Sequence, residues 1–214
     1  MTYLELVNDV LVRLRESTVT TVGETTYSSL IGKFVNDAKR QIEDTYTWNV
    51  LNQTVTVTTA ANTSSYSLTG TGQKFRIAEA LNTTSNIVLS NIAVSDMNRK
   101  LSFGTPAKGI PAQYCFNGAD SSGDTKVDLY PIPDGIFTLK FEVTIPQANL
   151  SSDSTSVKVL DYLVAQSAYA RALIERGEDG GTNSAEAYAL FRGMLSDAIA
   201  MESTRYPEDN FVAI

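Results

Sequence analysis

The sequence contains no histidine, and this single absence excludes several kinds of catalytic and metal site. There can be no Ser-His-Asp triad, no histidine general base and no histidine ligand for zinc. The one cysteine, Cys115, has no second thiol with which to form an internal disulfide or a cysteine-based zinc site. Its setting in QYCFN favours a buried thiol over a nucleophile. The phosphate-binding motif G-x-x-x-x-G-K-S/T is also absent.

Basic runs and long apolar runs are missing as well. The chain has 24 acidic and 17 basic side chains, a net charge of −7, and such a surface repels nucleic acid. No apolar stretch approaches the roughly 18 residues of a membrane span, and the N-terminus lacks the basic-then-apolar pattern of a signal peptide. We therefore predict a soluble intracellular protein. With 43% apolar residues, its 214 residues can form one domain or two small ones.

Helical periodicity is found at the two ends of the chain. A capping box at Thr2 begins the first helix, and a second helix runs from about Ser29 to an aromatic pair. Helix returns near Val157 and ends at Gly177, a plausible C-cap, and Asn183 resembles the N-cap of a last helix. On the second helix the pattern predicts a solvent-facing side made of Lys39, Arg40, Glu43 and Asp44.

Between residues 53 and 145 the apolar period is two, which indicates strands. The stretch VDLYPIPDGIFTLKFEVTI is typical of a hairpin, because the sequence Pro133-Asp134-Gly135 supplies turn chemistry. The residues after this turn alternate between apolar and polar, as in a half-buried strand of a small antiparallel sandwich or barrel. The predicted buried positions are Phe137, Leu139, Phe141, Val143 and Ile145.

The predicted fold is α+β, with a β module inserted into a helical frame. The N- and C-terminal helix pairs, residues 1–50 and 151–206, would form a four-helix bundle. Residues 51–150 would form an inserted antiparallel β-sandwich or barrel, and residues 207–214 a C-terminal tail.

The acidic clusters do not indicate a site. The loop GADSSGD, residues 118–124, lacks the register of a calcium loop, and a mobile hairpin loop accounts for it better. A carboxylate-based hydrolase would need two acids facing each other across a cleft, and no pattern here pairs any two of them. We therefore predict no catalytic residue, no cofactor and no metal site.

The order of these segments resembles the head-to-tail adaptor proteins of tailed bacteriophages, the tail tubular protein A type. The resemblance rests on YLELVNDVLVRLRE near the N-terminus, QIEDTYTWNV before the strands, GTPAKGIPAQYCF, VDLYPIPDGIFTLKFEVTIP and the helix LDYLVAQSAYARAL. These segments cover nearly the whole chain. The family has no catalytic residues to carry over.

The resemblance implies a homo-oligomeric ring, usually of twelve subunits, that docks beneath the portal protein. Such a ring extends the DNA channel, lets the genome pass without specific binding, and gives a platform for the next tail or nozzle component and possibly for tail fibres. It implies a place in the neck of the virion, assembly in the host cytoplasm and no contact with a membrane.

Two sets of residues are candidates for these contacts. The apolar end of the tail, Phe211, Val212 and Ile214, is the candidate for portal docking, and a frayed terminus is the alternative. Large aromatic residues exceed what one small bundle must bury, so they are candidates for inter-subunit packing, with a place in the core as the alternative. They are Tyr3, Tyr162, Tyr169, Tyr188 and Phe191.

A second class of function stays open, a β-sandwich carbohydrate or cell-surface binding module on a helical stalk. Exposed aromatic side chains on the sheet would favour it. The alternation instead puts Thr138, Lys140, Glu142 and Thr144 on the solvent face, which argues against a sugar-stacking platform.

Overall fold

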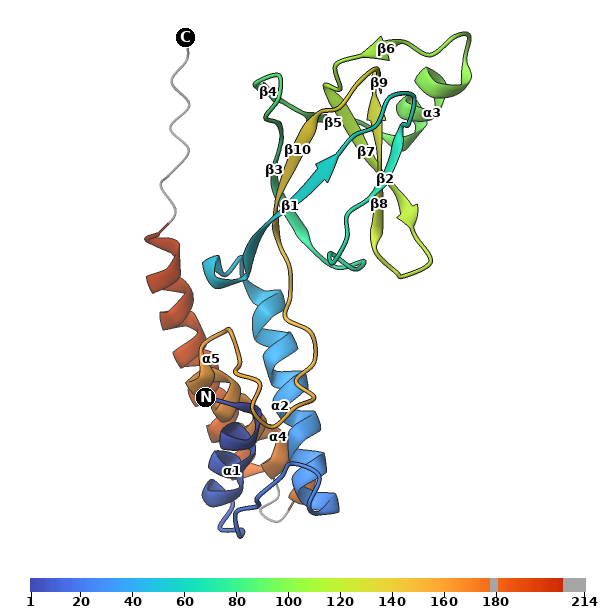
Figure 1. Cartoon of the computed structure of the whole chain (residues 1–214). Coiled ribbons are helices and arrows are strands. Elements are labelled where there is room, and N and C mark those ends of the chain that lie inside the picture. Colours follow the sequence, from blue (N-terminus) through green and yellow to red (C-terminus); the bar gives the residue numbers. More distant parts are fainter. Residues whose placement is uncertain (178–180, 206–214) are drawn as a thin grey trace. The chain divides into compact units, whose positions relative to one another are not determined.

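The computed structural model describes residues 1–177 and 181–205, and the chain divides into two compact units (Figure 1). The helical unit combines Met1–Leu51 with the chain that returns at Pro146. The β module is the inserted segment Asn52–Ile145. Both units contain a separate cluster of buried apolar side chains. The α+β class is confirmed.

The helical unit contains four α-helices and a short 3-10 turn within the described residues. Three of the helices pack against one another, and the fourth, α5, packs principally on α4. The predicted four-helix bundle is therefore not confirmed, because α5 lies at the margin of the unit. The elements are α1 (Tyr3–Arg13), α2 (Thr26–Thr45), η1 (Asn49–Leu51), α4 (Asp161–Arg176) and α5 (Thr182–Ser203).

The helix ends follow the local chemistry of the sequence in most places. The Thr2 hydroxyl accepts the Glu5 N–H at 3.3 Å and the Glu5 carboxylate accepts the Thr2 N–H at 2.8 Å, which confirms the capping box. Gly177 adopts a left-handed conformation at the end of α4, as predicted. The predicted cap at Asn183 is wrong, because α5 begins one residue earlier and its N-cap is Gly181.

A close approach of α1 and α2 explains a glycine within a helix. A Cβ atom on Gly32 would lie 2.4 Å from the Tyr3 hydroxyl oxygen and 2.8 Å from a methyl group of Val22. Tyr3 lies in the core of the unit, together with Trp48, whose indole N–H donates to the carbonyl of Ile42 at 2.7 Å. Trp48 thus packs beside the end of α2, with the Tyr46 ring edge-on at 5.7 Å.

The β module consists of two four-stranded sheets and one short two-stranded sheet. The first sheet has the order β1 (Asn52–Thr58), β10 (Thr138–Thr144), β3 (Arg76–Asn82) and β4 (Ile87–Val88). The second has the order β2 (Ser65–Ser67), β8 (Thr125–Tyr130), β7 (Gln113–Ala119) and β5 (Ser90–Asn91). The third pairs β6 (Lys108–Gly109) with β9 (Ile132–Pro133).

The predicted hairpin is wrong. Its two strands, β8 and β10, belong to different sheets, and the segment between them includes β9, which pairs in parallel with β6. Two further features differ from the expectation: the β5–β7 pair is also parallel, and a helix, α3 (Val94–Ser102), interrupts the strands. The turn residues therefore carry the chain from one sheet to the other.

The alternation along β10 is confirmed from Leu139 to Val143 and forms the centre of this module, with Phe137 and Ile145 partly buried at its ends. The predicted solvent-facing position of Thr144 is wrong, because this residue is buried and its hydroxyl donates to the Asn52 side chain at 2.7 Å. Leu139, Phe141 and Val143 are buried, and Lys140 between them is exposed. Their neighbours in the core include Tyr114 of β7, whose ring meets that of Phe141 edge-on at 5.7 Å. The apolar faces of the two larger sheets thus share one core.

Candidate assembly surfaces

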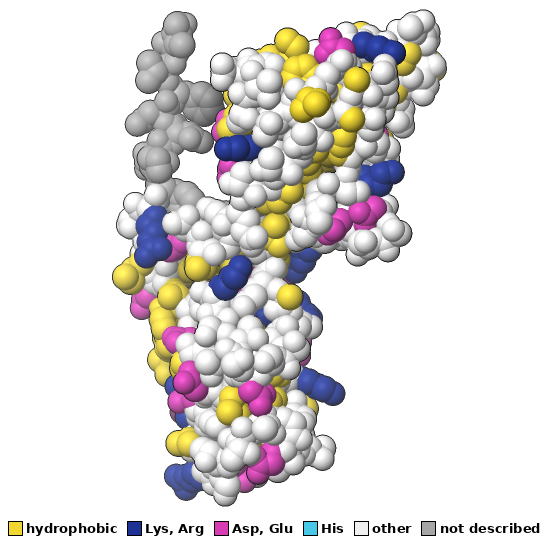
Figure 2. Space-filling model, viewed as in Figure 1, with side chains coloured by type: hydrophobic (Ala, Val, Ile, Leu, Met, Phe, Trp, Pro, Cys, Tyr) yellow, Lys and Arg dark blue, Asp and Glu magenta, His cyan; other side chains and the backbone are white. Residues whose placement is uncertain are grey.

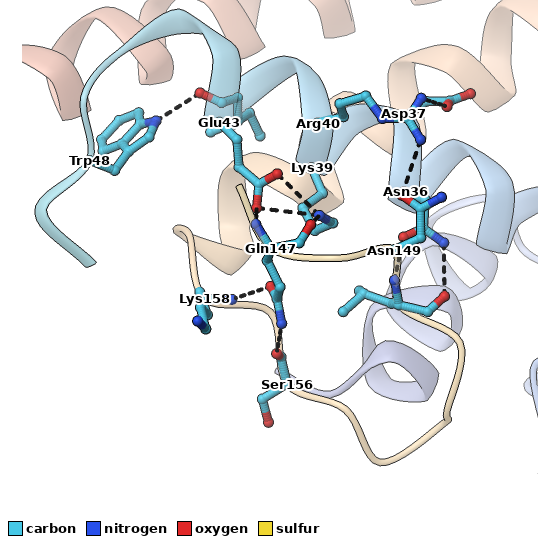
Figure 3. Close-up of polar contacts among 12 residues, drawn as sticks. Asn36, Asp37, Lys39, Arg40, Glu43, Trp48, Gln147, Asn149, Ser156 and Lys158 are labelled. Carbon is cyan, nitrogen blue, oxygen red and sulfur yellow. Dashed lines mark hydrogen bonds and ion pairs between the residues drawn. The ribbon is translucent and has the colours of Figure 1, made fainter. Parts of the chain in front are cut away.

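A buried ion pair lies where the chain re-enters the helical unit (Figure 3). Lys39 and Glu43 are one turn apart on α2, and each side chain is only 1% exposed. The Lys39 ammonium donates to the two Glu43 carboxylate oxygens at 3.1 and 3.3 Å and to the carbonyl of Gln147 at 2.5 Å. The Gln147 N–H donates back to Glu43 at 3.2 Å. The predicted solvent face is wrong at these two residues, because the returning segment covers them and completes their hydrogen bonds.

Further contacts fasten the same returning segment to α2. The Asn36 side chain donates to the carbonyl of Leu150 at 3.0 Å and accepts its N–H at 2.7 Å. Arg40 donates to the side chain of Asn149 at 3.0 Å. The Gln147 side chain bridges to the main chain of the segment that leads to α4. The chain that returns from the β module is thus held by one helix of the unit.

The charges of Lys39 and Glu43 have a structural role, because each is buried and paired with the other. Burial raises the pKa of Glu43, while Lys39 and the Gln147 N–H act to lower it. Every polar atom of the pair that the structure describes has a partner. A charge pair that is satisfied and enclosed in this way stabilises one arrangement of the chain and leaves no open position for a substrate.

Helix α5 exposes apolar side chains on two flanks. Because a helix turns by about 100° per residue, Leu190 and Met201 lie on one flank, and Tyr188 lies on the other. Their exposed fractions are 57%, 74% and 42%. Figure 2 shows hydrophobic side chains gathered along the edge of the helical unit that α5 forms. A helix that is apolar on more than its packed side is typical of an interaction surface.

The Tyr188 flank continues into a groove between helices. The groove has a volume of about 190 Å³, and Ile174 beside it is 62% exposed. Arg171 in its wall is tied to the side chain of Gln41 at 2.9 Å. The lining residues are Gln41, Ser167, Ala170, Arg171, Ile174 and Tyr188. The groove could receive an apolar side chain from another molecule.

The five aromatic candidates for inter-subunit packing lie in different settings. Tyr3 and Phe191 are buried in the core of the helical unit, at 7% and 1% exposure. Tyr169 is half-buried against that core. Tyr162 and Tyr188 are each 42% exposed. Phe211, Val212 and Ile214, the candidates for portal docking, lie outside the described residues.

Other surface residues were missed by sequence reasoning. Leu190, Met201 and Ile174 have larger exposed fractions than the predicted tyrosines. The signal for the first two is present in ALFRGMLSDAIAM, where apolar residues fall on more than one side of a helix.

The acidic loop of the β module, residues 118–124, is held by hydrogen bonds within the loop and by hydrogen bonds from residues 67–72. The Asp124 carboxylate accepts the N–H groups of Gly70 and Gly72 at 3.0 and 2.9 Å. A hydrogen bond from Ser67, with others from the loop backbone, lowers the pKa of Asp120. Cys115 is buried, as predicted, and burial raises its pKa. No group of three or more possible metal ligands occurs within residues 1–177 and 181–205.

Comparison with protein-family models gives a match over nearly the whole chain. Residues 1–210 match the family model described as SU10 adaptor protein. No curated protein matches the chain. In the part of the chain that the structure describes, none of the helices has the length and apolar character needed to span a membrane.

Proposed function

The chain belongs to the SU10 adaptor protein family, a phage head-to-tail adaptor family, and we propose that it forms a ring below the portal that extends the DNA channel. The family is structural and is not known for enzymatic activity. The observation that carries the proposal is the family match over residues 1–210. The proposed partners are further copies of the chain, twelve in a complete ring, the portal protein above and the next tail component below.

The surface of the helical unit supports assembly into a ring. Each member of a cyclic ring needs two different contact surfaces, because every contact joins one side of a copy to the other side of the next. The two flanks of α5 supply apolar side chains in two directions, Leu190 with Met201 on one and Tyr188 on the other. We propose these flanks as the contacts between copies. The exposed Tyr162, at the N-terminal end of α4, is proposed as a further contact.

Charge supports passage of DNA through the ring. Each copy carries a net charge of −7, so a closed ring has a strongly negative total charge. A negative channel wall repels phosphate and lets the genome move without binding.

The test of the proposed function is electron microscopy of this protein mixed with portal rings from the same phage. We expect a second collar of density on the portal, with matching symmetry. Bare portals beside free monomers at micromolar protein would contradict the proposal and would bring forward the alternative, a carbohydrate-binding module, which a glycan array can then examine.

A single charge on α5 should weaken the ring. Leu190→Asp places a carboxylate in the proposed apolar contact, and we expect portal occupancy to fall about thirtyfold, equivalent to about 2 kcal/mol per contact. The matched control is Val88→Asp in the β module, where the exposed fraction is 59% against 57% for Leu190. Equal occupancy for the two variants would exclude the Leu190 flank as a contact between copies.

The last residues are proposed to attach the ring to the portal. Deletion of residues 207–214, which removes Phe211, Val212 and Ile214, is expected to leave the fold intact and to weaken portal attachment about tenfold or more, since three apolar anchors are lost. Sedimentation of portal rings with the full chain and with the shortened chain measures the difference. Unchanged attachment would remove this segment from the portal contact.

A further inference from the structure

Strand β1 is an open sheet edge without the features that normally protect one. It lies at the margin of its sheet, and β10 is its only hydrogen-bonded neighbour among the described strands. Its seven residues, NQTVTVT, include no charged residue and no proline, and its register with β10 runs without a bulge. Charges, prolines, bulges and short strands are the usual means of preventing further pairing at an edge. β1 can therefore accept another strand.

The other sheet margins in the described chain are protected. The opposite margin of the same sheet is β4, which has two residues, and the neighbouring β3 has a register shift in its pairing with β10. The second sheet ends in β2, with three residues, and β5, with two. Beyond β5 the margin is formed by residues 115–119 of β7, where the pairing with β8 has a register shift. Long unprotected edge strands are uncommon in stable soluble proteins, so the exception at β1 calls for a function.

The hydrogen-bonding groups of β1 can be assigned to its two sides. The N–H of Thr59 donates to the carbonyl of Phe137 at 2.9 Å, directly after the last pair of the β1–β10 register. Opposed residues in an antiparallel pair alternate between bonded and non-bonded positions. The main-chain groups of Thr54, Thr56 and Thr58 therefore point away from β10, and all three residues are exposed. An incoming strand would find three N–H and three C=O groups in register.

The inner side of β1 would favour an apolar strand. Val57 is 6% exposed and Val55 is half-buried, and both belong to the apolar face of the module. Figure 2 shows hydrophobic side chains in an oblique band across the β module, along the course that β1 takes in Figure 1. An added strand with apolar residues at alternate positions would cover this band and extend the core.

We propose that β1 is the docking edge for an extended segment of the next tail component, which adds to the four-stranded sheet as a further strand. This inference rests on the proposed role of the protein as an adaptor between portal and tail. The segment has at least five residues, lacks proline, and carries apolar side chains at alternate positions. Recognition is through the main chain, since β1 offers no charge to select a partner.

A further copy of the chain does not fit this edge. Antiparallel pairing of β1 with another β1 relates two copies by a two-fold axis, and such a contact cannot continue around a ring. The other unpaired stretches among the described strands are residues 76–80 of β3 and 115–119 of β7, and the pairing of each strand is interrupted by a register shift. The proposed contacts between copies lie on α5, in the helical unit, and the proposed portal contact lies in residues 207–214. The edge of the β module is thus left for a different protein.

The test separates main-chain from side-chain recognition at Thr56. In Thr56→Pro the outward N–H is removed, while the bonds to β10 are kept, because proline is tolerated on an edge strand where its nitrogen faces solvent. In Thr56→Val the main chain is unchanged.

A phage that lacks its adaptor gene is complemented with each variant, and the particles are counted by electron microscopy as tailed, collared without tail, or without collar. With Thr56→Pro we expect normal collars and at least a tenfold loss of tails, and with Thr56→Val wild-type numbers.

Several outcomes would overturn the proposal. Normal tails with Thr56→Pro would show that the edge is not used. Loss of collars with folded Thr56→Pro protein would assign the edge to the portal or to a neighbouring copy. Loss of tails with both variants would indicate side-chain recognition. If Thr56→Pro does not fold, Thr56→Lys replaces it as an edge-blocking variant. Failure of the wild-type protein to restore collars would contradict the adaptor role itself, independently of Thr56.

Discussion

Replacing Lys39 by methionine is expected to lower the free energy of unfolding of the helical unit by about 3–5 kcal/mol. The methionine fills most of the volume of the lysine stem, so the loss comes from electrostatics rather than from a cavity. Glu43 would be left with a buried charge and no cation, and the carbonyl of Gln147 would lose its donor. Urea unfolding followed by circular dichroism measures the change.

A double variant shows whether the loss of stability comes from the unpaired charge or from the loss of the ion pair itself. Lys39→Met combined with Glu43→Leu removes both charges, and we expect it to recover most of the lost stability, because two apolar side chains can replace a buried ion pair at little cost. A double variant less stable than Lys39→Met alone would contradict this account. Arg40→Met, one residue away on the partly exposed side of α2, is the matched control and should change stability by less than about 1 kcal/mol.

The cost of Lys39→Met should also depend on pH. Burial already raises the pKa of Glu43 in the wild-type protein, and removal of the cation raises it further. A carboxyl group with a raised folded-state pKa binds its proton more readily in the folded chain than in the unfolded chain. The part of the penalty that comes from the Glu43 charge is therefore absent below the unfolded pKa and complete above the folded pKa. Unfolding at acidic pH is expected to show a smaller difference between variant and wild type than unfolding at neutral pH.

Features set by neighbouring residues could be predicted from the sequence. The capping box at Thr2 and the left-handed cap at Gly177 depend on a few adjacent groups, and both are confirmed. The burial of Leu139 and Phe141 follows from alternation alone. In each case the physical cause lies within one turn or one strand, so no knowledge of the remaining chain was needed.

Features set by distant segments could not be predicted in this way. The period of a strand shows which face is buried but not which sheet the strand joins, so β8 and β10 were assigned to one hairpin. Lys39 and Glu43 were predicted to face solvent because charged side chains are normally exposed. They are buried because Gln147 returns across α2 and completes their hydrogen bonds. The exposed flanks of α5 depend on how few helices pack against it.

The division into two units leads to a second large effect. Phe141→Ala removes a fully buried ring from the centre of the β module, together with its edge-on contact to Tyr114. A cavity of this kind is expected to lower the stability of the module by about 3–5 kcal/mol, and its unfolding temperature by about 12 °C or more. Amide hydrogen exchange, read separately for residues 52–145 and for the described helices, locates the loss.

We expect the helical unit to keep its protection in Phe141→Ala. The inserted module leaves after Leu51 and returns at Pro146, and both Asn36 and the Lys39–Glu43 pair hold the returning chain within the helical unit. An unfolded insertion then acts as a long loop, and the entropy cost of closing a loop grows only with the logarithm of its length. Phe191→Ala is the reciprocal variant, because its ring is buried in the other core. It should expose the amides of the helices and leave those of β10 and β7 protected. Loss of protection throughout the chain in both variants would mean that the two units fold as one cooperative body.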